Sequence, residues 1–169
     1  PTVLKSAANY YEYDIQDGDT PEIIAHKYYN DVYRYWMVLF TNQIIDPQWN
    51  WPLDNKTLQT YIDTKYPEVN VNDTVYDYQK IITKLDTGTN TTTIETITIS
   101  ADDYENLIEN SKSYNLPTGT VIVTISKKIR TLYDYEIEKN EAKKDIKIVV
   151  PSLLTDFVRD YYTALNSAI

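Results

Sequence analysis

The chain of 169 residues contains no cysteine, a single histidine (His26) and only three glycines (Gly18, Gly88 and Gly119). The absence of cysteine excludes disulfides, a thiol nucleophile and cysteine-ligated zinc or iron–sulfur centres. One histidine excludes the paired-histidine zinc motifs. Glycines this far apart cannot form a phosphate-binding loop, because such a loop needs several of them close together. We therefore expect no catalytic residue, no metal site and no cofactor.

Long apolar runs and an excess of positive charge are also missing. No apolar segment approaches the roughly 18 residues that span a bilayer. The first residues lack the basic-then-apolar layout of a secretory signal, so we expect synthesis in the cytoplasm. The net charge is −9, and such a chain repels DNA because affinity for nucleic acid depends on basic side chains. We predict no nucleic acid, no membrane and no small-molecule substrate as partner.

Tyrosine is the abundant residue, with 17 copies against two phenylalanines and three tryptophans. Tyrosine offers a large rigid contact surface with a polar tip, which suits protein interfaces as well as the edges of small cores. The apolar fraction of 42% is sufficient for a folded core. The composition therefore favours a folded protein that makes many contacts.

The first third of the chain predicts one strand and three helices. Residues 10–16 alternate as a half-buried strand does, and Asp17, Gly18 and Asp19 follow as a turn. Thr20 and Pro21 form a helix start. A second helix is expected to turn one apolar stripe inward, and Asp54 is expected to cap a third helix. The stripe consists of Val32, Tyr35, Trp36, Leu39 and Phe40.

The remainder predicts mainly strands. Residues 75–85 and 92–99 form a hairpin, and Ser100 with Asp103 forms a capping box for a short helix. A strand at 121–126 follows, then a strand pair at 132–137 and 146–150, and Ser152 caps a final helix. The fold class is α+β. We divide the chain into a tail (1–9), an N-terminal module (10–66), a linker (67–74) and a β-rich α+β assembly region (75–169).

The N-terminal module resembles LysM, in which a strand and two helices are followed by a short closing strand. The closing strand is not evident after Asn42, where a loop with Trp49 and Trp51 and a further helix follow. Because some LysM modules bind cell-wall glycans, the resemblance implies a glycan-binding module as the alternative function. The motif consists of Gly18, Asp19, Thr20, Ile24, Ala25, Trp36 and Asn42.

Over nearly its whole length the chain resembles a baseplate wedge protein of contractile-tailed bacteriophages. The matching segments are 16–25, 41–47, 51–53, 133–136, 140–144 and 157–158. The resemblance implies a structural, non-enzymatic protein of the virion tail. It implies that the protein clamps wedge-core subunits, meets a tube-proximal subunit and joins neighbouring wedges in a six-fold assembly.

Candidate interface residues come from the aromatic residues and from these segments. Trp49 and Trp51 are open to three interpretations, since they can cover the core, line a sugar groove or anchor a partner. The candidates are Tyr28, Tyr29, Trp49, Trp51, Tyr133, Tyr135, Glu136, Asn140, Glu141, Lys143 and Phe157.

Overall fold

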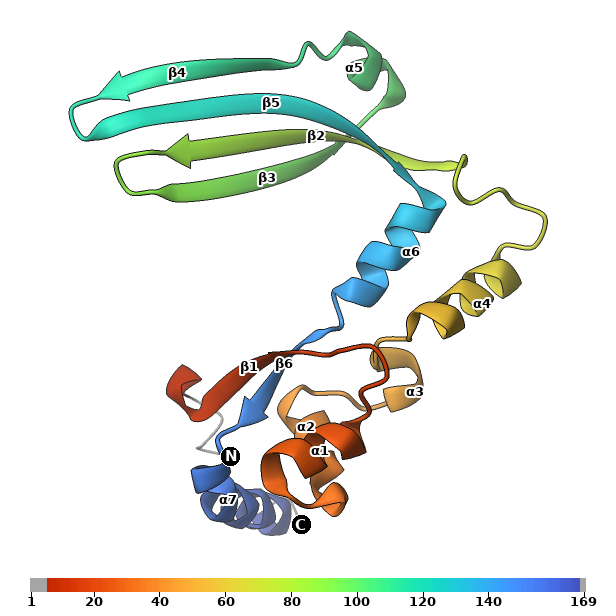
Figure 1. The fold of residues 1–169 in the computed structure, drawn as a ribbon, viewed down its shortest axis with the longest axis vertical. Helices are drawn as coiled ribbons and strands as arrows, with labels where there is room; N and C mark the ends of the chain where they lie inside the picture. Colours follow the sequence, from red (N-terminus) through yellow and green to blue (C-terminus); the bar gives the residue numbers. More distant parts are fainter. Residues whose placement is uncertain (1–5, 168–169) are drawn as a thin grey trace. The chain divides into compact units, whose positions relative to one another are not determined.

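The computed structural model describes residues 6–167, which form two compact units (Figure 1). The first unit combines residues up to Tyr61 with residues from Glu138 onward, and the second consists of Ile62–Ile137. The predicted α+β class with a C-terminal helix is confirmed. The division differs from the linear one expected, because the C-terminal segment packs with the N-terminal one and the second unit lies between them in the sequence.

The first unit is built on a two-stranded antiparallel sheet. Strand β1 (Tyr10–Asp14) pairs with β6 (Asp145–Val149), with Tyr10 opposite Val149 and Asp14 opposite Asp145. Ala7–Asn9 form a 3-10 turn before β1, and residues 1–5 of the expected tail lie outside the described residues. The helices of this unit are α1 (Pro21–Tyr29), α2 (Tyr35–Thr41), α3 (Pro47–Asn50) and α7 (Leu154–Ser167), with 3-10 turns at Val32–Arg34 and Pro151–Leu153.

Strand β6, the partner of β1, comes from the C-terminal part of the chain and not from the segment directly after Asn42. It begins at Asp145, more than a hundred residues further along. The prediction of a strand at 146–150 was therefore close, but its predicted partner at 132–137 was wrong. The pairing was missed because a local pattern cannot show which of several distant strands meets β1.

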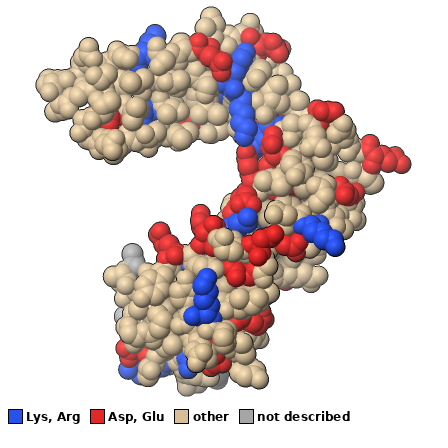
Figure 2. Space-filling view, viewed as in Figure 1, with Lys and Arg blue, Asp and Glu red and all other residues tan. Residues whose placement is uncertain are grey.

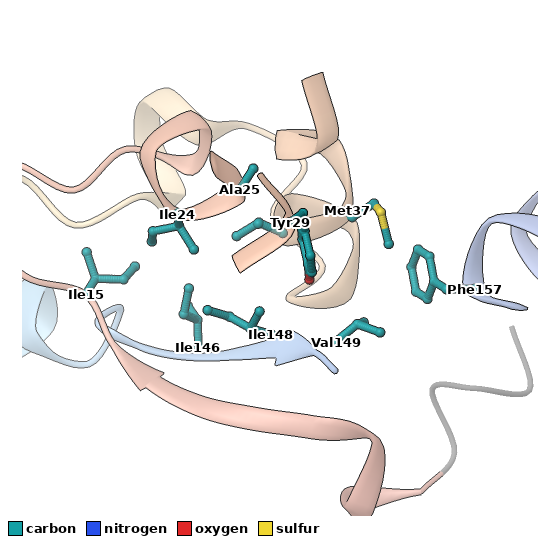
Figure 3. Packing of buried hydrophobic residues seen from close by; sticks show 10 residues of the cluster. Ile15, Ile24, Ala25, Tyr29, Met37, Ile146, Ile148, Val149 and Phe157 are labelled. Carbon is teal, nitrogen blue, oxygen red and sulfur yellow. The ribbon is translucent and has the colours of Figure 1, made fainter. Parts of the chain in front are cut away.

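The core of the first unit lies between the sheet and its helices (Figure 3). Helix α1 contributes Ile24 and Ala25, and both are fully buried. The C-terminal segment supplies four of the ten buried residues, so the two ends of the chain share one core. The cluster consists of Ile15, Ile24, Ala25, Tyr29, Met37, Val38, Ile146, Ile148, Val149 and Phe157.

The most buried residues of helix α2 are not those of the predicted stripe, of which Trp36 and Leu39 are half-buried and Trp36 packs against the core. Met37 and Val38 are fully buried, whereas Val32, Tyr35 and Phe40 are exposed. The cause is the 3-10 turn at Val32–Arg34, which precedes the α-helix. A 3-10 turn has 3.0 residues per turn instead of 3.6 and so shifts the helical phase. The predicted stripe assumed one continuous α-helix.

The second unit contains a four-stranded antiparallel sheet in the order β3-β2-β5-β4 (Figure 1). The predicted hairpin is confirmed as β2 (Val75–Asp86) and β3 (Thr91–Ile99), and Ser100 caps α5 (Ala101–Asn106) as expected. Strand β4 (Asn110–Leu116) was not predicted, and β5 (Gly119–Thr131) is longer than predicted. Helix α4 (Asn55–Lys65), which Asp54 caps through Thr57, runs into this unit from the first.

The segment predicted as a strand at 132–137 is instead the start of helix α6 (Leu132–Glu141). Thr131 and Asp134 form a reciprocal cap, in which the Thr131 hydroxyl accepts from the Asp134 N–H at 3.1 Å and the Asp134 carboxylate accepts from the Thr131 N–H at 3.0 Å. Such a cap satisfies backbone donors that a helix start leaves free. The alternation of Tyr133, Tyr135 and Ile137 suggested a strand, but the capping pair was present in the sequence.

Candidate interaction surfaces

The Gly18–Thr20 turn after β1 is held by hydrogen bonds within the first unit. Gly18 has a φ of +87°, which favours glycine, and the Thr20 hydroxyl accepts from the Ile23 N–H as the predicted N-cap. The Asp19 carboxylate accepts from the Tyr13 hydroxyl at 2.6 Å and from the Gln16 N–H at 3.0 Å. Burial, followed by this hydrogen bond to Asp19, raises the pKa of Tyr13. The motif residues thus build a rigid turn.

A hollow of about 270 Å³ lies beside this turn, between it and Trp51–Asp54. The indole N–H of Trp51 donates to the carbonyl oxygen of Asp19 at 2.9 Å. Trp51 is half-buried and packs against the core cluster. Of the three interpretations of Trp51, core cover describes its contacts best, although the same ring also lines the hollow.

Two asparagine side chains join the N-terminal and C-terminal segments of the first unit. The Asn42 amide pairs with both backbone groups of Lys147, donating at 2.8 Å and accepting at 2.7 Å. The Asn140 amide does the same with Leu53, donating at 2.9 Å and accepting at 2.8 Å. Asn42 therefore ties the N-terminal segment to the C-terminal one, and Asn140 makes the same kind of connection in the opposite direction. Asn140 is 4% exposed, so this interface candidate has an internal structural role in the isolated chain.

The loop that follows α2 projects an isoleucine outward. The Gln43 N–H donates to Phe40 and the Ile44 N–H donates to Leu39, which is a Schellman ending with Gln43 at a φ of 57°. Ile45 comes next and is 95% exposed. Beside it lies a hollow of about 530 Å³ lined mainly by Tyr10, Phe40, Thr41, Gln43, Ile44, Ile45 and Lys147. Sequence reasoning missed Ile45, because a lone apolar loop residue carries no periodic signal.

Replacing Gln43 with glycine is expected to stabilise the chain by about 0.5–1 kcal/mol, because a side chain is strained at a positive φ and glycine is not. The midpoint of urea unfolding should rise without a change in slope. The matched control is Gln48→Gly within α3, where glycine in a helical conformation should lower the midpoint instead. An equal shift for both variants would contradict this account of the loop.

Trp49 is a second exposed apolar residue of this region, after Ile45. It is 63% exposed and belongs to the single turn of α3, where Asp46 accepts from the Gln48 N–H as the cap. The Lys143 ammonium donates to the Trp49 carbonyl oxygen at 2.8 Å. Two of the predicted interface residues therefore meet, and Lys143 holds the backbone that carries the exposed indole.

Several predicted interface residues are buried inside their own unit. Phe157 is fully buried between α2 and β6, and Tyr29 is 8% exposed, with burial raising its pKa to about 12. Tyr28 is half-buried and its ring meets those of Tyr11 and Tyr13. These aromatic residues pack the first unit, and a partner cannot reach the most buried of them without unfolding it.

The candidates Tyr133, Tyr135 and Glu136 on α6 contact other residues of the second unit, whereas Glu141 belongs to the first unit. Glu136 is 2% exposed and accepts from the Lys65 ammonium at 2.7 Å and the Tyr66 hydroxyl at 2.8 Å, and the latter bond raises the pKa of Tyr66. Tyr135 stacks on Tyr76 with ring centroids 4.0 Å apart. Further contacts join Tyr133 to Val71, Glu141 to Lys144 and Arg130 to Asp77.

On the face shown in Figure 2, charged side chains of both signs lie next to one another, with few of them on the part of the sheet near the hairpin turns. Within residues 6–167, no group of histidine, aspartate and glutamate has the arrangement of a metal site. None of the helices in the same range is long and apolar enough to cross a membrane. The large apolar side chains that are exposed in the described part of the chain lie on helices and loops as well as on strands.

Comparison with known families settles which kind of protein carries these surfaces. The family model described as Base plate wedge protein 53 matches residues 3–163. The chain belongs to this family. A search of curated proteins found no match. Membership of a baseplate wedge family implies a structural role in the virion tail, in assembly with other baseplate proteins, and it suggests a function without catalysis.

Proposed function

We propose that this baseplate wedge protein clamps wedge-core subunits and joins neighbouring wedges in a six-fold ring, close to a subunit at the tail tube. The observation that carries the proposal is the division of one short chain into two compact units. Each unit exposes its own large apolar side chains. Two contacts on one chain raise the effective concentration of the second once the first has formed, which is what a clamp requires.

The first unit offers Ile45 and Trp49 as the anchors of one contact. They lie four positions apart in the chain and are 95% and 63% exposed. The Schellman ending at Gln43 and Ile44 directly precedes Ile45, and Lys143 donates to the backbone carbonyl oxygen of Trp49. Rigid, exposed apolar anchors lose little conformational freedom on binding and are typical of energetic hot spots.

Replacing Ile45 and Trp49 together with alanine is expected to reduce incorporation into wedges at least about thirtyfold, since one hot-spot residue contributes about 2 kcal/mol or more. Folding should be unaffected, because both side chains are exposed. The measurement is competition between tagged wild-type and variant chains for incorporation into particles, with Ile23→Ala, an exposed residue of α1 (48%), as control. Equal incorporation of the double variant and wild type would remove this contact from the proposal.

The glycan-binding alternative has two observations in its favour. The order β1, α1, α2 and β6, with the two strands paired antiparallel, supports the LysM-like prediction for the first unit. The hollow beside Gly18–Thr20 lies at the loop that a LysM groove would use. A pull-down on insoluble cell wall distinguishes the two functions. Retention that is lost in Trp49→Ala and Trp51→Ala favours glycan binding, and no retention beyond a matched acidic protein favours the assembly role alone.

A further inference from the structure

The four-stranded sheet of the second unit has two different edges, formed by β3 and β4 (Figure 1). Strand β3 pairs with β2 along its whole length, from Thr91 opposite Asp86 to Ile99 opposite Tyr78. Backbone groups of a strand in an antiparallel sheet point alternately to its two sides. Within the described residues, no backbone hydrogen bond joins the outer side of β3 to another segment. An edge about 30 Å long is therefore available for pairing.

The β3 edge lacks the usual protection against strand pairing. Its sequence is Thr-Thr-Thr-Ile-Glu-Thr-Ile-Thr-Ile, with one charge, no proline and no register shift against β2. Residues 91–98 are all exposed, and Ile94 is 68% exposed. A long, regular edge of β-branched residues is a template for another strand. In Figure 2 the part of the sheet near the hairpin turns also shows few charged side chains.

The β4 edge of the same sheet provides a comparison. It is shorter, with seven residues, and carries Lys112 together with two asparagines, two serines and the exposed Tyr114 and Leu116. A lysine on a short edge discourages pairing. The sheet is thus protected on one edge and open on the other, although both edges face solvent in the isolated chain.

The single charge on the open edge indicates the chemistry of the strand that fits it. Glu95 is the middle residue of β3, with Thr and Ile on both sides. In a fully overlapped antiparallel pair of two β3 strands, residue 95 would face residue 95 of the other copy. Two glutamates directly opposite each other repel, whereas a lysine or arginine opposite Glu95 is favourable. The net charge of −9 likewise disfavours a second copy of the chain.

We propose that β3 is completed by an extended strand from another baseplate protein, rich in β-branched residues and with a basic side chain opposite Glu95. Backbone hydrogen bonds along the edge would supply affinity, and the glutamate would fix register and exclude self-pairing. The proposal rests on the assembly role above, and it names the class of partner segment that the second unit binds.

Hydrogen–deuterium exchange tests the proposal directly. The backbone amides of residues 91–99 are compared in the purified free chain and in assembled baseplates from phage particles. We expect roughly half of these amides, those on the outer side of β3, to become protected on assembly. The amides of residues 110–116 serve as the internal reference. Unchanged exchange across residues 91–99 in baseplates that contain the chain would overturn the proposal, while absence of the chain from particles would refute the assembly role itself.

A pair of charge reversals tests the chemistry of the partner strand. Glu95→Lys is expected to lower incorporation into baseplates about fivefold or more in competition with wild type, because it places like charges opposite each other. Lys112→Glu reverses a charge on the other edge and should have no such effect. Far-ultraviolet circular dichroism of both free chains should match wild type, since residue 95 is exposed. Incorporation of Glu95→Lys at the wild-type level would overturn the assignment of a basic partner strand.

Discussion

A chain that ends at Lys144 is expected to lose the fold of its N-terminal part, although residues 6–61 are all present. The deletion removes β6, which is the strand that pairs with β1, and four residues of the shared core. Burial of Ile146, Ile148, Val149 and Phe157 contributes about 1.5–3 kcal/mol each, or about 6–12 kcal/mol together. That loss is comparable with the whole stability of a domain, about 5–15 kcal/mol. Amide NMR spectra of the truncated chain should show collapsed dispersion for residues 10–50.

The matched control is a chain that ends at Tyr162. It retains β6 and Phe157 and removes the end of α7, where residues 163–166 are exposed. This shorter truncation should keep native dispersion for residues 10–50. A chain ending at Lys144 that still folds there would show that the N-terminal segment forms an independent module, as the sequence alone suggested. It also follows that loss of assembly in long C-terminal truncations reports unfolding before it reports a lost contact.

Replacing Asn140 with alanine is expected to destabilise the first unit by about 2–4 kcal/mol. The substitution removes two hydrogen bonds and leaves the N–H and the C=O of Leu53 without their partner in a half-buried position. A buried backbone group that loses its partner costs about 1–3 kcal/mol. The measurement is chemical unfolding followed by tryptophan fluorescence, since Trp36 and Trp51 pack against the core of this unit.

Asn72→Ala provides the control for Asn140→Ala, because Asn72 is exposed and its substitution should change stability by less than about 0.5 kcal/mol. Asn42→Ala should cost less than Asn140→Ala, because its amide makes the same two bonds but pairs with Lys147, whose exposed backbone can bond to water instead. A variant at position 140 as stable as the one at position 72 would show that solvent replaces the lost hydrogen bonds. In that case the two asparagines would not be what holds the segments together.

Local features of the fold were predictable because their causes lie within a few residues. The caps at Thr20, Asp54 and Ser100 are present, since a capping side chain bonds a backbone N–H only two or three positions away. The β2–β3 hairpin is present because alternating β-branched runs flank a short turn. The same local evidence, read fully at Thr131 and Asp134, would also have identified α6.

Candidate interface residues were predicted less well, because side-chain type does not determine exposure. Tyr29 and Phe157 were chosen as aromatic contact residues, but the packing of α1 and α7 buries them. Trp49 was chosen on the same grounds and is exposed. Ile45 and the β3 edge were not chosen, since their exposure depends on what other segments leave uncovered.

The sequence by itself determined the class of this protein. The composition excluded cysteine chemistry, paired-histidine metal motifs and glycine-rich phosphate loops, and the motif segments indicated the baseplate wedge family, which the family match confirmed. Only the tertiary structure decided that β6 closes the sheet begun by β1 and that two asparagines join these distant segments. The physical reason is the separation of the contacting residues along the chain. Helix caps and hairpins form between near neighbours, whereas the β1–β6 pairing and the common core depend on which distant segments fold together.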